Sequence, residues 1–459
     1  YGLDYIDIDP LFWAPYADGT HITIWRDVEK TVESIAAVSP EDGEAYLQFH
    51  QMWMPLAEGM VEAFNSPPTV GNLVDSMGVK PGYGSEWLPK LRDILGGYGP
   101  LLRRTFKSEK VQALLGWMAA QSGPPPGAAM SGPFVLWHPM YHVGGMRRPR
   151  GGSGMLTQAL ARMIQAHGGE IHLNSMTERI MVQGGKAVGI VLANGEQVTA
   201  ERVLSGAHIH ATLGMLGDSK PEKKQKGRIG NGFGMVVRYA MNALPNYTAL
   251  PTAADGSPGY QHRAMQFLCP TLDYLDAAFV DYERGEISRE PALISMTWSA
   301  VDDTLAPAGK HVMFLWGQYY PYELADGANW DEIAPRVAER MLDKAAEYAP
   351  NVKGAVIDGL IEHPVYLERT LGLRRGNVMH LEMSVDQMFF NRPHWTMGQY
   401  RGPVKGLYLT GASTHPGGGI MGAAGRNAAL TMLADMEKVG VKAGGRFDWK
   451  DSTTEALRH

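Results

Sequence analysis

Glycines gather densely around a histidine and a serine near the end of the chain, in GASTHPGGGIMG from Gly411 to Gly422. A short apolar run, Leu407–Leu409, comes before this stretch and is typical of a buried strand. An Ala-, Leu- and Met-rich segment, 423–436, follows it and is typical of a helix. Glycines let the backbone approach a ligand closely, and a helix N-terminus offers unpaired N–H groups. The pattern therefore predicts a site for a phosphate or an electron-rich ring.

The same glycines satisfy a known spacing, because Gly417, Gly419 and Gly422 form G-x-G-x-x-G between the expected strand and helix. A dinucleotide fingerprint also needs a second strand with an acidic residue about 20 residues further on. Only Glu437–His459 follows the expected helix, and glycines interrupt Gly440–Trp449. The spacing alone does not indicate a dinucleotide fingerprint, and a helix packed tightly under a strand through glycines remains an alternative.

The run Gly411–Ala429 resembles the C-terminal flavin-contacting motif of the phytoene desaturase-like FAD-dependent oxidoreductases. Within that family it is most similar to the branch of pyridine nucleotide-disulfide oxidoreductase domain-containing protein 2. The resemblance implies FAD rather than NAD as the cofactor, with this strand and helix against the flavin end. The FAD contacts that it implies in this run are Gly411, Ala412, Ser413, His415, Pro416, Gly418, Gly419, Ile420, Met421, Gly422, Ala423 and Asn427.

Two earlier stretches match the family in the right order. Arg150, Gly151 and Gly152 precede a predicted helix, 155–167, with Ser153 as its expected N-cap. They either approach a phosphate or form a solvated basic turn, and the relatives also have a Gly-Gly turn here. Short β-prone runs separated by Gly-Gly and Asn-Gly turns then predict a meander over 171–205. The resemblance implies that Thr177 meets the adenine and that Gly206 and Ala207 lie beside the FAD.

The resemblance implies an α/β (mixed α+β) fold of the phytoene desaturase/amine oxidase type, with a Rossmann-like FAD domain and a second, substrate-binding sheet domain. The expected parts are substrate-domain strands and helices (1–139), a FAD-domain part with the meander (140–220), the substrate-binding domain (221–400), the flavin-contacting strand-turn-helix (401–440) and a tail (441–459). In the family, a further N-terminal βαβ unit holds the pyrophosphate. We find no equivalent of it in this sequence. An incomplete sequence, a separate partner chain and a relative that has lost FAD all remain open.

Composition narrows the class of protein. A hydrophobic content of 44% and a charged content of 20% are typical of a folded domain, and the net charge of −6 gives no reason to expect nucleic acid. The single cysteine, Cys269, excludes an internal disulfide and a cysteine-based metal site. The 26 methionines and 11 tryptophans fit either an ordinary core or a cavity for a large apolar molecule. The sequence contains no run of about 18 apolar residues, so no membrane span is expected.

Local patterns predict several further elements. Asp18-Gly19 marks a hairpin. A helix is expected to start at Ser39-Pro40, and an amphipathic helix is expected over 335–348. Strands are expected over 294–298 and 311–316. The first of these helices should bury one apolar stripe made of Tyr46, Phe49, Met52, Trp53, Leu56, Met60 and Phe64.

Other titratable groups give weaker signals. Asp302-Asp303 and the pair Glu382 and Asp386 are either acids for proton transfer or, as we favour, turn and salt-bridge residues. His138 and His142 are four residues apart, but Pro139 lies between them and no acid is near, so we predict no metal site. No catalytic side chain is predicted.

The resemblance implies an FAD-dependent oxidoreductase, a dehydrogenase, desaturase or oxidase, that moves hydride from an apolar small molecule to flavin. A flavin amine oxidase and a non-catalytic scaffold or partner subunit are the alternatives. An amine oxidase would need an aromatic cage, for which the candidates are Trp298, Trp316, Tyr319 and Tyr320. The expected location is the cytoplasm or an organelle matrix, with at most peripheral membrane contact, and a homo-oligomer is an open option.

Overall fold

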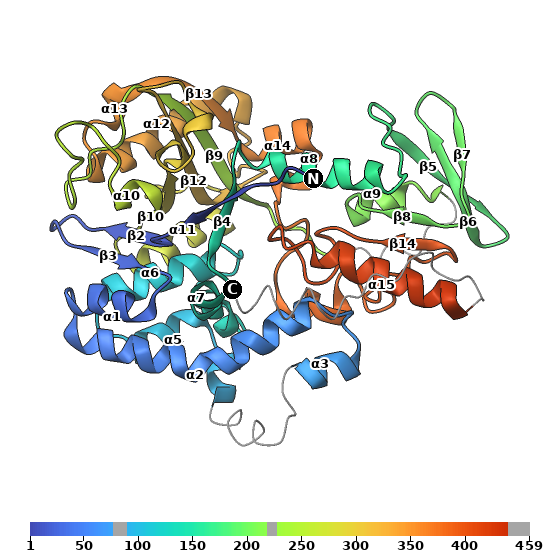
Figure 1. Cartoon of the computed structure of the whole chain (residues 1–459), viewed down its shortest axis with the longest axis horizontal. Helices are drawn as coiled ribbons and strands as arrows, with labels where there is room; N and C mark the ends of the chain where they lie inside the picture. The colour runs from blue at the N-terminus through green and yellow to red at the C-terminus, as the bar shows by residue number, and fades with distance from the viewer. Residues whose placement is uncertain (77–89, 218–226, 439–459) are drawn as a thin grey trace. The chain divides into compact units, whose positions relative to one another are not determined.

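The computed structural model describes residues 1–76, 90–217 and 227–438 (Figure 1). The chain divides into two compact units. The first comprises Tyr1–Pro55, Lys90–Ile171 and Asn231–Gly376, and the second comprises Leu56–Pro89, His172–Gly230 and Asn377–His459. Both combine helices and strands, which confirms the predicted mixed α/β class. The predicted tail, 441–459, lies outside the described residues, and the predicted domain boundaries stay predictions.

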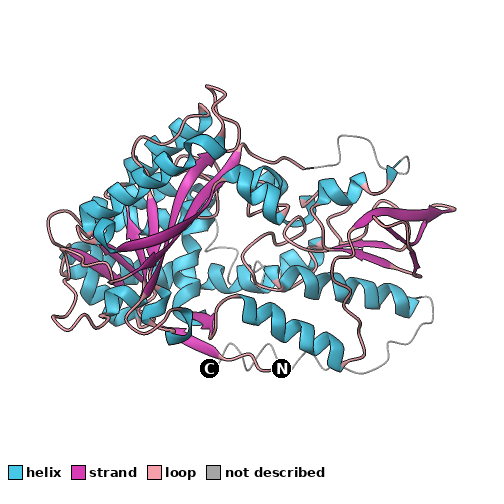
Figure 2. Ribbon diagram, turned by 90° about the horizontal axis from the view of Figure 1, so that it is seen from above, coloured by secondary structure: helices cyan, strands magenta, loops and turns pink. Residues whose placement is uncertain are grey.

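A seven-stranded sheet organises the first unit (Figure 2). Its strands, in spatial order, are β13 (Val356–Glu362), β9 (Gly232–Met241), β12 (His311–Pro321), β11 (Leu293–Met296), β10 (Met265–Leu268), β2 (Phe12–Pro15) and β3 (His21–Ile24). Only the β10–β2 pair is parallel. Strands β2 and β3 form the hairpin predicted at Asp18-Gly19, where Gly19 has a φ of +82°. The two strands predicted over 294–298 and 311–316 are confirmed as β11 and β12, although Trp298 lies in a 3₁₀ turn beyond β11.

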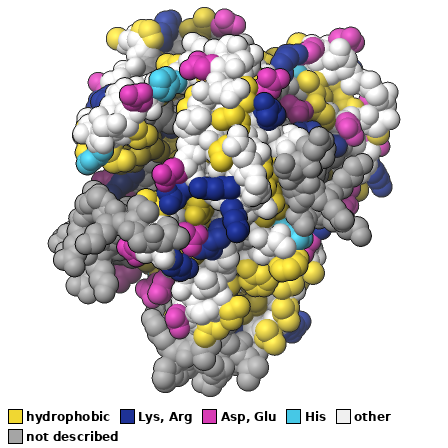
Figure 3. All heavy atoms as spheres, turned by 90° about the vertical axis from the view of Figure 1, so that its right-hand side faces the viewer, with side chains coloured by type: hydrophobic (Ala, Val, Ile, Leu, Met, Phe, Trp, Pro, Cys, Tyr) yellow, Lys and Arg dark blue, Asp and Glu magenta, His cyan; other side chains and the backbone are white. Residues whose placement is uncertain are grey.

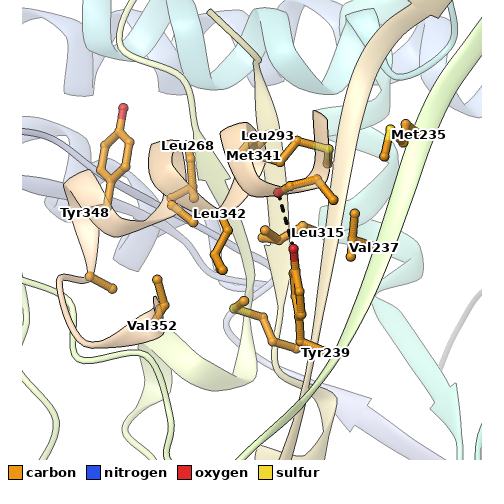
Figure 4. Close-up of a cluster of buried hydrophobic side chains, with 14 of the residues drawn as sticks. Met235, Val237, Tyr239, Leu268, Leu293, Leu315, Met341, Leu342, Tyr348 and Val352 are labelled. Atoms are coloured by element: carbon orange, nitrogen blue, oxygen red, sulfur yellow. Dashed lines mark hydrogen bonds between the residues drawn. The ribbon is translucent and has the colours of Figure 1, made fainter. Parts of the chain in front are cut away.

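One face of this sheet packs against α12 (Trp330–Tyr348). Leu293 and Leu315 of the sheet and Met341 of the helix are fully buried in this core (Figure 4). Tyr239 lies in the same core, and its hydroxyl donates to the Ala338 carbonyl at 3.3 Å. The helix begins five residues before the predicted start because the Asn329 side chain caps it, and Pro335 lies inside the helix, where it removes one backbone hydrogen bond.

Aromatic side chains cover part of the opposite face of the sheet. Phe267 stacks on Trp117 of α6 (Glu109–Ala120) with ring centroids 6.0 Å apart, and Phe12 meets Tyr141 of α7 (Trp137–Gly144) at 5.2 Å. Further along the same face, Phe314 and Trp316 are only half-buried. This face therefore combines a packed region with apolar side chains that remain partly accessible.

The remaining elements of the first unit are mostly helical. They are β1 (Tyr5–Ile8), β4 (Met146–Pro149), α1 (Val28–Ala36), α2 (Pro40–Phe64, whose last residues belong to the second unit), α5 (Tyr98–Thr105), α6 (Glu109–Ala120), α7 (Trp137–Gly144), α8 (Gly154–Ala166), α10 (Tyr260–Arg263), α11 (Leu272–Glu283), α13 (Val352–Ala355) and α14 (Pro364–Leu371).

Helices α2 and α8 can be compared with their predicted starts, buried face and N-cap. Helix α2 begins at Pro40 as expected, and its stripe is buried except for Met52, which is 49% exposed, so that assignment was wrong. Helix α8 is close to the predicted 155–167, but Ser153 makes no capping hydrogen bond because its backbone is already helical.

The second unit contains the predicted meander, formed by β5 (Thr177–Gln183), β6 (Lys186–Leu192) and β7 (Gln197–Thr199). The strand expected at 171–173 is absent: residues 171 and 172 form no regular element, and Leu173 lies in a turn. A separate parallel pair consists of β8 (Val203–Ser205) and β14 (Leu407–Leu409). The helices are α3 (Val70–Ser76), α9 (Ile209–Gly214) and α15 (Ala423–Lys438), which confirms the predicted last strand and helix.

Apolar side chains also reach the protein surface. Figure 3 shows hydrophobic side chains gathered on one face beside Lys and Arg side chains. The most exposed of the large ones in the second unit are Ile420, Leu173, Met176 and Val70. Among the described residues, no helix combines the length and the apolar character needed to cross a membrane.

Candidate cofactor site

Parallel pairing brings two of the predicted cofactor turns together in the second unit. Strands β8 and β14 run side by side, with Ser205 opposite Leu409, and Thr410 N donates to the Ser205 carbonyl at 2.9 Å. Because the strands are parallel, the turns that follow them leave the same edge. A Cβ built on Gly411, which has a φ of +85°, would lie 3.1 Å from the Gly206 carbonyl oxygen. Glycine therefore permits the close approach of these two turns.

Ser413 connects the second turn to α9. Its side chain is 2% exposed, and its Oγ accepts a hydrogen bond from the Ile209 backbone N–H at 3.0 Å. The same Oγ lies 3.1 Å from Nδ1 of His380. Ser413 thus links three segments that are far apart in the sequence and fixes the start of α9 beside the turn.

His208 adds a second link to the same histidine. Its Nε2–H donates to the His380 carbonyl at 3.0 Å, while its Nδ1 accepts from the His210 backbone N–H at 3.1 Å. These two bonds place the ring proton on Nε2, which leaves the ring neutral. The His208 and His380 rings stack with centroids 5.2 Å apart. Burial, together with the nearby charge of Arg392, lowers the pKa of His380.

Arg392 is completely buried below the turn. Its Nε and Nη2 donate to the Ala412 carbonyl at 3.1 and 2.9 Å. Its other hydrogen bonds go to the carbonyls of Met379, Leu381, Glu382 and Gln387. The guanidinium therefore holds the 379–387 segment against the turn.

His415 is held in an aromatic environment. Its ring is 1% exposed, lies near Phe64 and Phe389, and has Nε2 2.9 Å from the Ala63 carbonyl. Burial lowers the pKa of His415 to about 4, so the ring is neutral at physiological pH. The Tyr400 hydroxyl donates to the His415 carbonyl at 2.8 Å. His415 therefore anchors the turn rather than offering a free base.

The glycines after Pro416 form an open turn before α15. Gly417, Gly419 and Gly422 all have positive φ, at +110°, +116° and +68°, which favours glycine. A Cβ on Gly418 would meet the Met379 sulfur at 2.6 Å, whereas a Cβ on Gly422 would meet nothing within 4 Å. The exposed Ile420 and Met421 lie in the same turn. The first N–H groups of α15, from Ala423, lack intrahelical acceptors and can bind an acceptor on a ligand.

Asn427 closes the site from within α15. It is fully buried, and its Nδ2 donates to the Phe64 carbonyl at 3.0 Å and to the Tyr400 hydroxyl at 3.1 Å. Its Oδ1 has no hydrogen-bond partner among the described residues. A buried acceptor without a donor is unusual and is suited to a polar group on a ligand. The open glycine turn and this free acceptor together fit a polar, planar cofactor.

The remaining predicted contact residues are distributed over both units. Thr177 pairs with Leu192 in the meander, and Ala207 follows Gly206 at the edge described above. Arg150, Gly151 and Gly152 belong to the first unit, where Gly151 N–H donates to Asp302 and Arg150 to Asp303, at 2.8 and 2.9 Å. The cofactor roles of these residues stay predictions.

The acidic pairs act as turn and salt-bridge residues, as the sequence favoured. Asp302 accepts from the Thr304 hydroxyl at 2.6 Å and caps a 3₁₀ turn. Glu382 and Asp386 pair with Arg228 at 3.3 and 2.5 Å.

The two histidines of α7 are held by the protein itself. His142 lies 2.7 Å from the Tyr46 hydroxyl and 3.0 Å from the Arg26 carbonyl, while burial lowers the pKa of His138 to about 3. Within residues 1–76, 90–217 and 227–438, no three His, Cys, Asp or Glu side chains are arranged to hold a metal ion.

Sequence reasoning assigned no role to four residues that build this site: His208, His380, Arg392 and Tyr400. Three of them come from 377–400, a segment of the second unit, to which β14 and α15 also belong. Short 3₁₀ turns fill the segment, including η7 (Val385–Gln387) and η8 (Phe389–Asn391), so it has no helical or strand periodicity. The one available signal was an arginine two residues after the apolar run Met388-Phe389-Phe390, without an acid beside it.

Comparisons with known proteins agree with this geometry. Residues 36–241 match the family of flavin containing amine oxidoreductases. The chain is also 36% identical over 372 residues to pyridine nucleotide-disulfide oxidoreductase domain-containing protein 2 of Rattus norvegicus, covering 77% of this chain and 63% of that protein. It is 25% identical to the neurosporene-forming phytoene desaturase of Rhodobacter capsulatus, covering 94% of this chain and 80% of that protein. The predicted resemblance to FAD-dependent oxidoreductases is confirmed.

A solved structure shares the fold. An oxidoreductase from Methanosarcina mazei superposes with a TM-score of 0.54 and 17% identity, covering 94% of this chain and 82% of the other. At that identity the likeness establishes the fold alone. The chain spans 63% of the length of the rat relative, so the activity and substrate of the whole protein are matters for proposal.

Proposed function

We propose that this chain is an FAD-dependent oxidoreductase that transfers hydride from an apolar organic substrate to flavin. The observation that carries the proposal is the site at the edge of β8 and β14. There, two close glycine turns, the part-buried Ser413–His380 link and the open turn before α15 meet in one unit. The match to the flavin containing amine oxidoreductases supports the choice of cofactor.

The protein's own residues would bind and orient the cofactor. Backbone groups of the Gly417–Gly422 turn and the first N–H groups of α15 would contact the flavin, and the positive end of the helix would favour negative charge there. Asn427 Oδ1 would accept a hydrogen bond from a donor of the ring system. Bound FAD supplies the hydride acceptor. No side chain of this site needs to act as a nucleophile.

The first unit offers a surface suited to an apolar substrate. On the sheet face away from α12, Met296, Phe314 and Trp316 are half-buried and lie on neighbouring strands. Such apolar and aromatic side chains typically line sites for small apolar ligands. The name of the bacterial relative, a phytoene desaturase, supports the same class of substrate.

The amine oxidase alternative has weaker structural support. It needs an aromatic cage, but Tyr319 and Tyr320 are fully buried, and the Tyr319 hydroxyl is bonded to the Pro124 carbonyl at 3.1 Å. Trp316 donates to its neighbour Gln318 at 2.7 Å, and Trp298 carries Arg148 over its ring at 5.0 Å. A guanidinium over Trp298 would repel a cationic amine.

A matched pair of glycine substitutions tests the proposed site. Gly422 and Gly309 have φ of +68° and +71°, and a Cβ at either position meets no atom within 4 Å. Gly422→Ala and Gly309→Ala therefore impose the same backbone strain, but only the first adds a methyl group in the proposed flavin turn. We expect Gly422→Ala to weaken FAD binding at least about tenfold and Gly309→Ala to leave it unchanged. Equal FAD affinities of the two variants, measured by fluorescence titration, would refute the assigned site.

A further inference from the structure

The buried Arg392 carries a charge that no carboxylate balances among the described residues. A guanidinium has five N–H donors, and here all of them point to backbone carbonyls. Nε contacts Ala412, Nη1 contacts Glu382 and Gln387 at 3.0 and 3.3 Å, and Nη2 contacts Met379 at 2.6 Å as well as Leu381 and Ala412. No N–H group is left over for an acidic side chain elsewhere in the chain.

Two other arginines of the same unit behave differently. Arg401 forms two bonds with Asp435, at 2.7 and 2.8 Å, and Arg228 pairs with Glu382 and Asp386. Both are partly exposed, whereas Arg392 is fully buried. Burial lowers the pKa of Arg392 to about 9, which still leaves it charged at neutral pH. Among the described residues, Arg392 is thus a buried positive charge whose hydrogen bonds all go to backbone carbonyl dipoles.

Burying such a charge is unfavourable, because carbonyl dipoles replace water only in part. An apolar side chain would fill the same volume without this penalty. A role that needs the charge itself explains its presence better than packing does. The position indicates the role, since Arg392 lies under the turn that we assign to flavin. A Cβ on Gly417 would lie 3.3 Å from its Nε, and Ala412 accepts from it directly.

We propose that Arg392 is a positioning residue of the flavin site that also supplies the positive charge favouring reduced flavin. The inference rests on the proposed function. Flavin gains negative charge when it accepts hydride, and a charge fixed in a water-free interior interacts more strongly than one in solvent. The guanidinium fork also ties the 379–387 segment to Ala412, so it holds the turn in the shape that receives the ring.

Two substitutions in the full-length protein separate these effects. Arg392→Met removes the charge and keeps an unbranched side chain, whereas Arg392→Lys keeps the charge but has three donors in place of the fork. Arg228→Met is the matched control, because Arg228 braces the same segment from outside with a charge that two acids balance. The readouts are the flavin midpoint potential, by dye equilibration, and the affinity for oxidised FAD.

We expect Arg392→Met to lower the preference for reduced over oxidised flavin at least about tenfold, which is about 30 mV for a two-electron couple. Arg392→Lys should keep the wild-type potential while binding FAD more weakly. Arg228→Met should keep the potential, because two acids already balance the charge of Arg228.

The outcomes distinguish this inference from the proposed function. If the wild type binds FAD and the Arg392→Met potential is unchanged, the charge has no such role and only this inference is overturned. If the wild type takes up no FAD, the proposed function fails and this inference fails with it. Should Arg392→Met not fold, Arg392→Lys decides. An unchanged potential with weakened FAD binding supports the inference, and a lowered potential or unchanged binding overturns it.

Discussion

Removing the Ser413 hydroxyl should loosen the link between the two cofactor turns. In Ser413→Ala, the Ile209 N–H loses its acceptor in a place where Ile209 is only 1% exposed, and Nδ1 of His380 loses its partner. A buried donor left unpaired costs about 1–3 kcal/mol, and the bond at the half-exposed His380 adds about 0.5–1.5 kcal/mol. We therefore expect a local destabilisation of about 2–4 kcal/mol in the flavin-free protein.

Hydrogen exchange measures this effect at the site itself. At about 1.4 kcal/mol per factor of ten, the lower limit corresponds to roughly 30-fold faster amide exchange in peptides that cover 205–216 and 407–416. Ser175→Ala is the control, because that hydroxyl makes one local bond to the Leu173 carbonyl in an exposed turn. This control substitution should change the local opening free energy, measured by amide exchange, by less than about 0.5 kcal/mol. Exchange in Ser413→Ala that matches the control would refute the assigned link.

Two further predictions concern buried titratable groups. The pKa of His415 is about 4 in the folded protein and about 6.5 in the unfolded chain, so the unfolded chain binds the proton more readily. The stability that the neutral ring contributes is therefore full above pH 6.5 and is lost as the pH falls toward 4. The loss in unfolding free energy is about 3 kcal/mol at most. A plot of unfolding free energy against pH should therefore be flatter for His415→Gln than for the wild type over this range. A plot parallel to that of the wild type would contradict the assignment. Burial raises the pKa of the Cys269 thiol, so Ellman's reagent should react with the folded protein far more slowly than with the denatured one. Rapid labelling of the native protein would contradict this burial.

Local sequence signals located much of the second unit. The strand at Leu407–Leu409 and the helix from Ala423 follow from an apolar run and a glycine turn, and both elements are confirmed. The meander follows from Gly-Gly and Asn-Gly turns, which set short antiparallel pairs. Strands, helices and turns of this kind depend on residues that are close together in the chain, so they can be predicted from local sequence patterns.

Long-range contacts account for what the sequence did not reveal. Ser413 meets Ile209 and His380, which lie 204 and 33 residues away, and no local pattern marks either contact. Arg392 looks like a surface residue in the sequence, since its acceptors are backbone carbonyls that carry no residue-type signal. Met52 fits the helical spacing of the α2 stripe but is exposed, because spacing sets a face of the helix and tertiary packing sets the width of the buried part.

The visible absorption spectrum of the purified full-length protein, before and after denaturation, tests the central claim most directly. The account predicts the bands of oxidised flavin in the folded protein and free FAD in the supernatant after denaturation. A colourless preparation that also takes up no added FAD would contradict it, and a non-catalytic scaffold or partner subunit would then be the better description.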